Sequence, residues 1–271
     1  MSAFDNTLNA DGALVVGAGL AGLFTALKLA PRPVTVLSPK PLGTGASSAW
    51  AQGGVAAAMG EGDNAHAHAQ DTEIAGAGIV DHGIAEGVTA EAASRIEDLA
   101  RWGTPFDRDD FGNFALGREA AHSANRIVKV EGDRAGWAIM QAIIAQVRNT
   151  PSIRVVEGIT ALSLARDNGR IVGIYARRLG DRYSEPIFIR ARATILAAGG
   201  LAGSMRSPPI PPACVVTPWA WRPGPAPSSP IPNSCNSIPP PSPPAPTRPR
   251  SPPRPCAGKA PSLSTIWASV S

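Results

Sequence analysis

Short apolar runs alternate with amphipathic stretches, and this pattern predicts alternating strands and helices. Ala13–Val16 is an apolar run that ends in glycine, which is typical of a buried parallel strand. Apolar residues then recur at helical spacing, which predicts a helix over Leu20–Ala30. Val34–Leu37 is the next apolar run. Strand, helix and strand within about 25 residues have the size of a βαβ unit.

The alternation continues to residue 197. Ser47–Met59 is small and glycine-rich, and we expect a loop that leads into a helix. Two stretches with an apolar face are expected to be helices, Thr89–Trp102 and Gly136–Val147. The expected strands are Ile153–Val156, Ala161–Ala165, Ile171–Arg177, Ile187–Arg192 and Thr194–Ala197, with a turn at Asn168–Gly169. The predicted fold class is therefore α/β with a small β-rich segment near residues 153–192.

Composition divides the chain near Gly203. Residues 204–271 contain 21 of the 28 prolines, all three cysteines and six basic residues, but no acid. Residues 1–203 carry 21 acids and 19 basic residues, so their formal charge is −2. The basic pI of about 9.3 therefore comes from the tail and does not indicate nucleic-acid binding by the folded part. We expect a domain over 1–203 and a disordered tail over 204–271.

Several kinds of protein are excluded by what the chain lacks. No run reaches the roughly 18 apolar residues of a membrane span, and the first residues have no secretory-signal pattern. Residues 1–203 contain no cysteine, which excludes thiolate metal sites there. His66 and His68 have no third ligand nearby, so we expect no metal. The expectation is a cytoplasmic protein without a membrane or nucleic-acid partner.

A glycine-rich turn between the first strand and helix indicates nucleotide binding, with a purely structural turn as the alternative. Its sequence is GAGLAG, residues 17–22. The first glycine permits a tight turn, the second lets the backbone approach a pyrophosphate, and the third allows close helix–strand packing. The helix N-terminus then binds the diphosphate. The acid that usually holds the ribose is replaced by Ser38-Pro39-Lys40, which argues against a plain NAD site.

Residues 47–57, SSAWAQGGVAA, resemble the S-x-x-x-A-Q-G-G-I-A-A stretch of the succinate dehydrogenase, fumarate reductase and L-aspartate oxidase flavoproteins. EIAGAG at 73–78 and ILAAGG at 195–200 agree with the same family, so the resemblance covers residues 12–203. It implies a Rossmann-like FAD-binding domain. Covalently flavinylated members carry a histidine where this chain has Ser47, so non-covalent FAD is implied.

The residues expected to contact the cofactor come from five segments of the chain. They are Gly17, Ala18, Gly19, Leu20, Ala21, Gly22, Ser38, Lys40, Ser47, Ser48, Ala49, Trp50, Ala51, Gln52, Gly53, Gly54, Thr160, Ala161, Gly199 and Gly200.

GREAAHS at 117–123 resembles the R-E-G/A-G/A-H-S motif of the aspartate oxidase branch. The resemblance implies that Glu119 orients the substrate through its ammonium group, which a carboxylate suits. The alternative is a surface ion pair of Glu119 with Arg118 or Arg126. The branch commonly has two basic residues where this chain has Ala124-Asn125, and often His in place of Lys129, so fine substrate contacts stay open. The remaining expectations are structural: His122 as a hydrogen-bonded residue, Trp50 and Trp137 as packing residues.

The tail is interpreted as translation in a shifted reading frame, with a native proline-rich linker as the alternative. Residues 232–242, PNSCNSIPPPS, can be written in codons that, read one base back, give EFVQFHPTAI. This string resembles a motif of the aspartate oxidase branch. The same shift converts residues 204–211 to LYAVTTNP and residues 260–270 to AILVNDLGERF, which are also family-like. A single-base insertion or deletion near codon 203 is the resulting hypothesis.

The resemblance implies oxidation of L-aspartate to iminoaspartate, with oxygen or fumarate as electron acceptor, and quinolinate synthase as a possible pathway partner in NAD synthesis. Substrate-binding Arg and His residues lie mostly in later parts of such proteins, so we expect the 271-residue chain to be inactive. Two alternatives stay open at this point. One is a succinate dehydrogenase or fumarate reductase flavoprotein subunit, and the other is a non-catalytic nucleotide-binding or proline-rich interaction protein.

Overall fold

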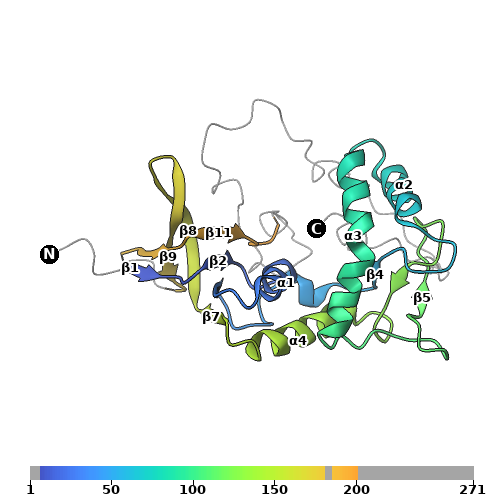
Figure 1. Ribbon diagram of the computed structural model, residues 1–271, viewed down its shortest axis with the longest axis horizontal. Helices are drawn as coiled ribbons and strands as arrows, with labels where there is room; N and C mark the ends of the chain where they lie inside the picture. Colours follow the sequence, from blue (N-terminus) through green and yellow to red (C-terminus); the bar gives the residue numbers. More distant parts are fainter. Residues whose placement is uncertain (1–6, 181–184, 201–271) are drawn as a thin grey trace, which may run out of the picture.

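A four-stranded parallel sheet forms the centre of the fold. The computed structural model describes residues 7–180 and 185–200 (Figure 1). The sheet has the order β11-β2-β3-β7, and all its neighbouring strands are parallel. Its strands are β2 (Ala13–Val16), β3 (Val34–Ser38), β7 (Ile153–Glu157) and β11 (Ala193–Leu196). The apolar run of β2 is thus flanked by a parallel strand on each side, as expected for a buried strand.

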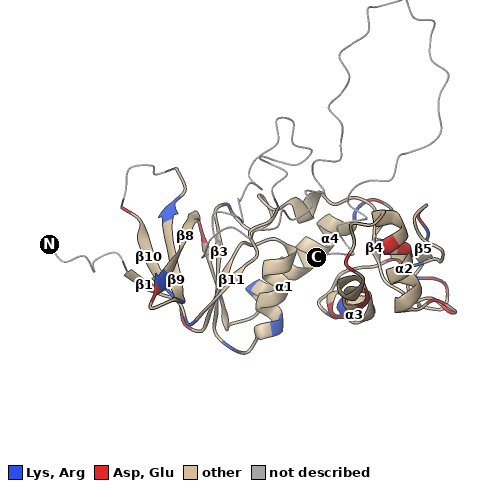
Figure 2. Ribbon diagram, turned by 90° about the horizontal axis from the view of Figure 1, so that it is seen from above, with Lys and Arg blue, Asp and Glu red and all other residues tan. Residues whose placement is uncertain are grey.

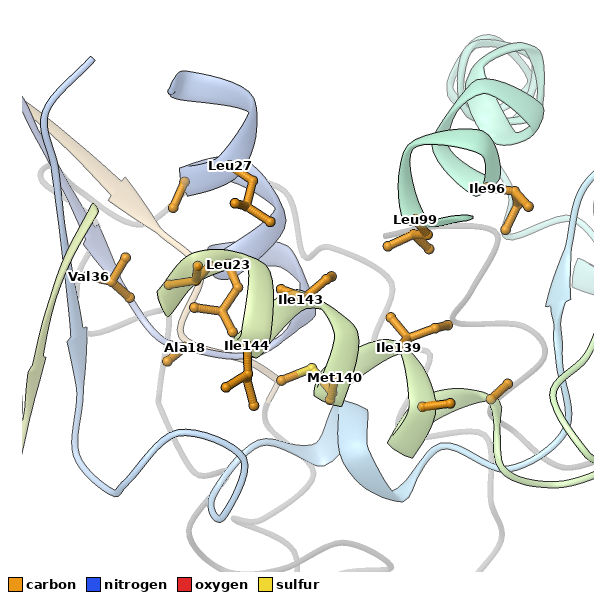
Figure 3. Close-up of a cluster of buried hydrophobic side chains, with 14 of the residues drawn as sticks. Ala18, Leu23, Leu27, Val36, Ile96, Leu99, Ile139, Met140, Ile143 and Ile144 are labelled. Atoms are coloured by element: carbon orange, nitrogen blue, oxygen red, sulfur yellow. The ribbon is translucent and has the colours of Figure 1, made fainter. Parts of the chain in front are cut away.

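Two helices cover one face of this sheet. They are α1 (Leu20–Leu29) and α4 (Ala135–Arg148). Buried side chains of α4 recur at helical spacing, and they include Ile139, Met140, Ile143, Ile144 and Val147. Figure 3 shows Ile143 beside α1 and Ile139 on the side of Leu99. The helix α3 (His82–Arg101) adds Ile96 and Leu99 to the same core. The principal core therefore lies between the parallel sheet and its helices.

A second, mainly antiparallel layer packs on the other face of the parallel sheet. It has the order β1-β10-β9-β8, formed by β1 (Thr7–Asn9), β8 (Ile159–Asp167), β9 (Arg170–Arg178) and β10 (Ile187–Arg190). In this layer β1 and β10 pair in parallel, and the other neighbouring strands are antiparallel. Leu14, Val16 and Leu37 of the parallel sheet pack against this layer, whereas Val15 and Val36 belong to the helical core. This alternation follows the period of two along a strand.

A smaller unit lies at the opposite end of the molecule from the antiparallel layer (Figure 2). It contains α2 (Ala65–Gly76), α3 and a three-stranded sheet in the order β4-β6-β5. The strands are β4 (Val55–Ala56), β5 (Leu116–Gly117) and β6 (Ile127–Val128). Lys28 on α1 pairs with Asp98 on α3 at 2.9 Å, which ties this unit to the central helices. Among the described residues, no helix has the length and apolar character needed to cross a bilayer.

Most predicted elements are confirmed, and four predictions need correction. The expected helix Thr89–Trp102 begins seven residues earlier, at His82, and ends at Arg101. Residues 47–59 contain a 3-10 turn at Ser47–Trp50 and β4, and the following helix begins only at Ala65. β7 joins the parallel sheet, so the β-rich segment is smaller than expected, because partner choice is not encoded in a local pattern. The expected strand Ile187–Arg192 ends at Arg190. The predicted tail, residues 204–271, lies outside the described residues.

Candidate functional site

The turn between β2 and α1 lies at the carboxyl edge of the parallel sheet, where open α/β sheets bind ligands. Gly17 has φ +113°, and a Cβ there would lie 2.2 Å from the carbonyl oxygen of Ala197. A Cβ on Gly22 would lie 2.0 Å from the carbonyl oxygen of Gly17. The close approach of β11 and the start of α1 therefore requires both glycines for packing reasons.

Gly19 differs from its two neighbours in the motif. Its φ is −82°, and a Cβ would have its nearest neighbours at 3.5 and 3.6 Å, which is ordinary van der Waals contact. The protein's own packing therefore has room for a side chain at this position. Room at the N-terminus of α1 would let the protein backbone approach a bound ligand closely.

The N-terminus of α1 faces the 3-10 turn at Ser47–Trp50. The Leu20 N–H donates to the Ser48 hydroxyl at 3.2 Å, and no acidic residue lies in the first turn of α1. The positive end of the helix is therefore not compensated by a carboxylate of its own first turn. Ala18 and Ala21 complete the motif, with Ala18 buried and Ala21 exposed.

The end of β3 holds the next two expected residues. The buried Ser38 hydroxyl donates to the Lys40 carbonyl at 2.5 Å, and the Lys40 methylenes lie beside Gly45. Glu157, at the end of β7, stands opposite Ser38 in the sheet register and accepts the Leu42 N–H at 2.8 Å. The sequence analysis did not single out Glu157, whose only local signal is its place at the end of a strand that adjoins β3.

Four further expected contacts lie on β8 or after β11. Thr160 and Ala161 are in β8, and the Thr160 hydroxyl is buried without a hydrogen-bond partner among the described residues. Gly199 has φ +83° and follows β11. Between them, the Ala197 N–H donates to the Val16 carbonyl of the neighbouring strand β2 at 2.9 Å. Gly199 and Gly200 thus follow the strand that ends beside the Gly17 turn, at the same edge of the sheet.

The segment Ser47–Gly54 connects this edge to the smaller sheet. The Ala51 carbonyl accepts the Gly136 N–H of α4 at 3.3 Å. Gly53 has φ +80°, and a Cβ on Gly54 would lie 2.3 Å from the Val128 carbonyl oxygen of β6. Both glycines are therefore needed where the chain enters β4. Gln52 lies between Ala51 and Gly53, while Ala49 is half-buried.

Trp50 and Trp137, the expected packing residues, are only partly covered by the described part of the chain. Trp50 is 67% exposed and Trp137 is 49% exposed. The Arg134 guanidinium lies over the Trp137 ring, 5.0 Å from its centroid. Neither ring is buried among the described residues, and Trp137 packs against the Arg134 side chain.

Glu119 lies on the loop between β5 and β6, next to the Ser47–Gly54 segment. Its Oε1 would be 3.3 Å from a Cβ built on Gly53. The His122 N–H donates to the Glu119 carbonyl at 3.0 Å, which closes a turn, and Arg118 Nε donates to the His122 carbonyl at 2.9 Å. The fold therefore brings Glu119 to the predicted cofactor segment, although the two are far apart in sequence.

A buried ion-pair network lies beneath this loop. Arg126 is fully buried, and its guanidinium pairs with Asp63 through two bonds of 2.8 and 3.0 Å. A third bond of 2.8 Å joins Arg126 to Asp71 of α2. Sequence reasoning did not find this network, because charged partners that lie far apart in the chain leave no local signal.

Two buried histidines adjoin the network. The rings of His68 and His122 meet edge to face with centroids 5.5 Å apart, and none of their ring nitrogens has a hydrogen-bond partner among the described residues. The described hydrogen bonds of His122 are therefore those of its backbone, and none reaches its ring. His66, the other candidate ligand, is exposed and contacts Glu86 at 3.0 Å. The described residues contain no group of three or more side chains placed to hold a metal.

Burial makes the folded protein sensitive to acid at His68. Burial, with the nearby Arg126 guanidinium, lowers the pKa of His68 to about 4 and also lowers the pKa of His122. In the unfolded chain the histidine takes up a proton near its ordinary pKa of 6.5, whereas in the folded protein it stays neutral down to about pH 4. The stability present above pH 6.5 is therefore lost as the pH falls from 6.5 toward 4. We expect the free energy of unfolding to fall by about 3 kcal/mol over this window.

Urea unfolding between pH 7 and 4 measures this effect. His68→Gln should flatten the profile, whereas His66→Gln, which changes an exposed ring of the same helix, should retain it. An unchanged slope in His68→Gln would exclude His68 as the source. The pKa values of Asp71 and Asp98 are lowered below their ordinary value of 3.8, so these carboxylates do not account for a loss in this window.

Comparison with known proteins agrees with this geometry. The family described as FAD binding domain matches residues 12–221, beyond the point where the composition changes. An L-aspartate oxidase from Caulobacter vibrioides is 48% identical over 197 residues, which are 71% of this chain and 38% of that protein. One from Mesorhizobium japonicum is 46% identical over 70% of this chain and 36% of that protein. The chain thus spans less than two fifths of the length of these relatives.

Solved structures show the same fold. Mycobacterium smegmatis Sdh1 in complex with UQ1 superimposes with a TM-score of 0.66 and 26% identity, over 74% of this chain and 35% of that chain. A variant of the E. coli quinol fumarate reductase FrdA has a TM-score of 0.67 at 23% identity, over 74% and 34% of the two chains, and supports the fold alone. Since the family match covers most of its length, the chain belongs to the FAD binding domain family of flavoproteins.

Proposed function

We propose that the edge formed by residues 17–22, 38–40, 47–54 and 199–200 binds FAD non-covalently. The main support is Gly19, because the packing of the protein leaves room for a Cβ at this position. A ligand that lies close to the backbone would account for the lack of a side chain there. The first N–H groups of α1 would face the diphosphate, with Ser48 beside them. Ser47 stands where covalently flavinylated proteins carry a histidine, so the chain offers no imidazole for that link.

We propose L-aspartate as the substrate and iminoaspartate as the product. FAD, when bound, supplies the two-electron redox chemistry by accepting a hydride from the substrate α-carbon. Glu119, beside Gly53, would accept a hydrogen bond from the substrate ammonium and hold the α-carbon toward the cofactor. Identity of 42–48% to several L-aspartate oxidases supports this choice. The same proposal includes oxygen or fumarate as the electron acceptor, quinolinate synthase as a pathway partner and the cytoplasm as the compartment.

The domain boundary at residue 203 and the shifted frame after it are proposed on composition and codon reading alone. The family match ends at residue 221, so it does not mark this boundary. We expect the gene to carry a single-base insertion or deletion near codon 203. Sequencing codons 195–271 and the bases that follow tests this: we expect the frame one base back to stay open and family-like from codon 204 onward, and stop codons in that frame would overturn the proposal.

The second candidate is oxidation of succinate, favoured by the fold shared with Mycobacterium smegmatis Sdh1. Activity of the 271-residue chain and of a frame-corrected protein separates the candidates. We expect no turnover of L-aspartate by the chain as written, and turnover by the corrected protein at least about tenfold above its turnover of succinate, a difference of about 1.4 kcal/mol. Preference for succinate would support the second candidate, and turnover of L-aspartate by the chain as written would refute the proposed inactivity.

A further inference from the structure

A series of hydrogen bonds that the proposed reaction does not use lies beneath the Glu119 loop. The loop runs from Gly117 to Arg126 and is closed at its base by the Arg126 N–H, which donates to the Gly117 carbonyl at 2.9 Å. Asp71 Oδ2 accepts the Ser123 N–H at 2.6 Å and the Ser123 hydroxyl at 2.8 Å. The same oxygen accepts from Arg126 Nη1 at 2.8 Å. A single carboxylate oxygen of α2 thus fixes the loop at two points.

Asp71 is in turn held by groups that cannot move freely. Its partner Arg126 has no exposed side-chain surface and is anchored by Asp63, which is 2% exposed. An ion pair so fully removed from water holds its geometry because breaking it would leave an uncompensated buried charge. The Ser123 backbone is therefore placed by a rigid support, and Ser123 directly follows the turn that joins the His122 N–H to the Glu119 carbonyl.

We propose that Asp71, held by Arg126, is a positioning residue that sets the place of the Glu119 carboxylate beside Gly53. This inference rests on the proposed function, because a fixed Glu119 carboxylate matters only if it orients the substrate. Asp71 touches neither cofactor nor substrate in this arrangement and acts through Ser123. Without the Asp71 carboxylate, the turn loses its attachment to α2 and Glu119 samples positions away from Gly53.

A double-mutant cycle on the full 271-residue chain with FAD tests the proposal. The readout is the dissociation constant of sulfite, an anion that binds the flavin and bleaches its visible absorbance. In the wild-type background, Glu119→Gln should tighten sulfite binding about fivefold, because it removes a negative charge near the flavin. In the Asp71→Ala background the same change should have an effect below about twofold, since the carboxylate has already left its place.

Two further variants separate positioning from general stability. Asp98→Ala removes another buried, ion-paired carboxylate, which belongs to α3. It should lower the melting temperature but leave the effect of Glu119→Gln on sulfite binding at about fivefold. Asp71→Asn retains an oxygen that can accept the Ser123 N–H and should restore part of the effect. An equal effect of Glu119→Gln in the wild-type and Asp71→Ala backgrounds would overturn the proposal.

A measurement without FAD keeps this inference separate from the proposed function. Asp71→Ala should speed amide hydrogen exchange at Ser123 and His122 by at least about tenfold in the ligand-free chain, because their local attachment is lost. Asp98→Ala should leave this exchange unchanged. Absence of FAD binding by the wild-type chain would contradict the proposed function alone, and unchanged exchange in Asp71→Ala would contradict the positioning role.

Discussion

Gly19→Ala should leave the ligand-free protein folded and weaken FAD binding by roughly tenfold to a hundredfold. The added methyl meets only ordinary contacts at 3.5 and 3.6 Å in the protein itself. With FAD bound, it would occupy the space through which the diphosphate approaches the backbone, and such overpacking costs about 1–3 kcal/mol. Titration of FAD by fluorescence, together with thermal unfolding of the ligand-free variant, measures both effects.

Two glycine variants serve as controls for this prediction. Gly17→Ala should destabilise the ligand-free fold itself, because its Cβ would lie 2.2 Å from a carbonyl oxygen at φ +113°. Gly87→Ala, in the middle of α3 with open space around it, should raise stability by about 0.5–1 kcal/mol and leave FAD affinity unchanged. Wild-type FAD affinity in Gly19→Ala would show that the Gly19 turn does not contact the cofactor.

Glu119→Gln in a frame-corrected protein should lower kcat/KM for L-aspartate by about thirtyfold to a hundredfold, with FAD affinity unchanged. The change replaces a charge-assisted hydrogen bond to the substrate ammonium by a neutral one, and hydrogen bonds to charged groups contribute about 1.5–3 kcal/mol. The alternative, an ion pair that only stabilises the surface, predicts a small loss of stability and normal kinetics. Arg126, one of the two partners in that alternative, pairs with Asp63 and Asp71.

Steady-state kinetics with L-aspartate distinguish the two roles of Glu119. Glu97→Gln, which removes an exposed carboxylate from α3, is the matched control and should retain wild-type kcat/KM. A value for Glu119→Gln within about threefold of the wild type would contradict the substrate-orienting role, whatever the change in melting temperature.

The βαβ unit could be predicted almost to the residue because its signal is local. A continuous apolar run, a glycine turn and a helical stripe of leucines occupy adjacent positions, and the observed β2 and α1 begin at Ala13 and Leu20 as predicted. The turn at Asn168–Gly169 is confirmed by positive φ at both residues. Each of these features depends on neighbours within a few positions.

Features that depend on distant partners could not be predicted. The bounds of α2 could not be predicted, because only His68 and Ala69 of its residues are buried. The helix therefore has little apolar periodicity and depends on its cap at Asn64 and its packing against α3. The Arg126 network joins three segments that no local pattern connects. The substrate role of Glu119 is implied by the family resemblance, whereas its place beside Gly53 is seen only in the structure, because a single carboxylate in a loop indicates neither.

The central claim is that the described edge of the parallel sheet binds FAD without a covalent link. Titration of the purified 271-residue chain with FAD, followed by denaturation and filtration, tests it most directly. We expect saturable binding of one FAD per chain and complete recovery of free flavin after denaturation. A chain that unfolds cooperatively and yet binds no FAD, or one that keeps its flavin after denaturation, would contradict this claim.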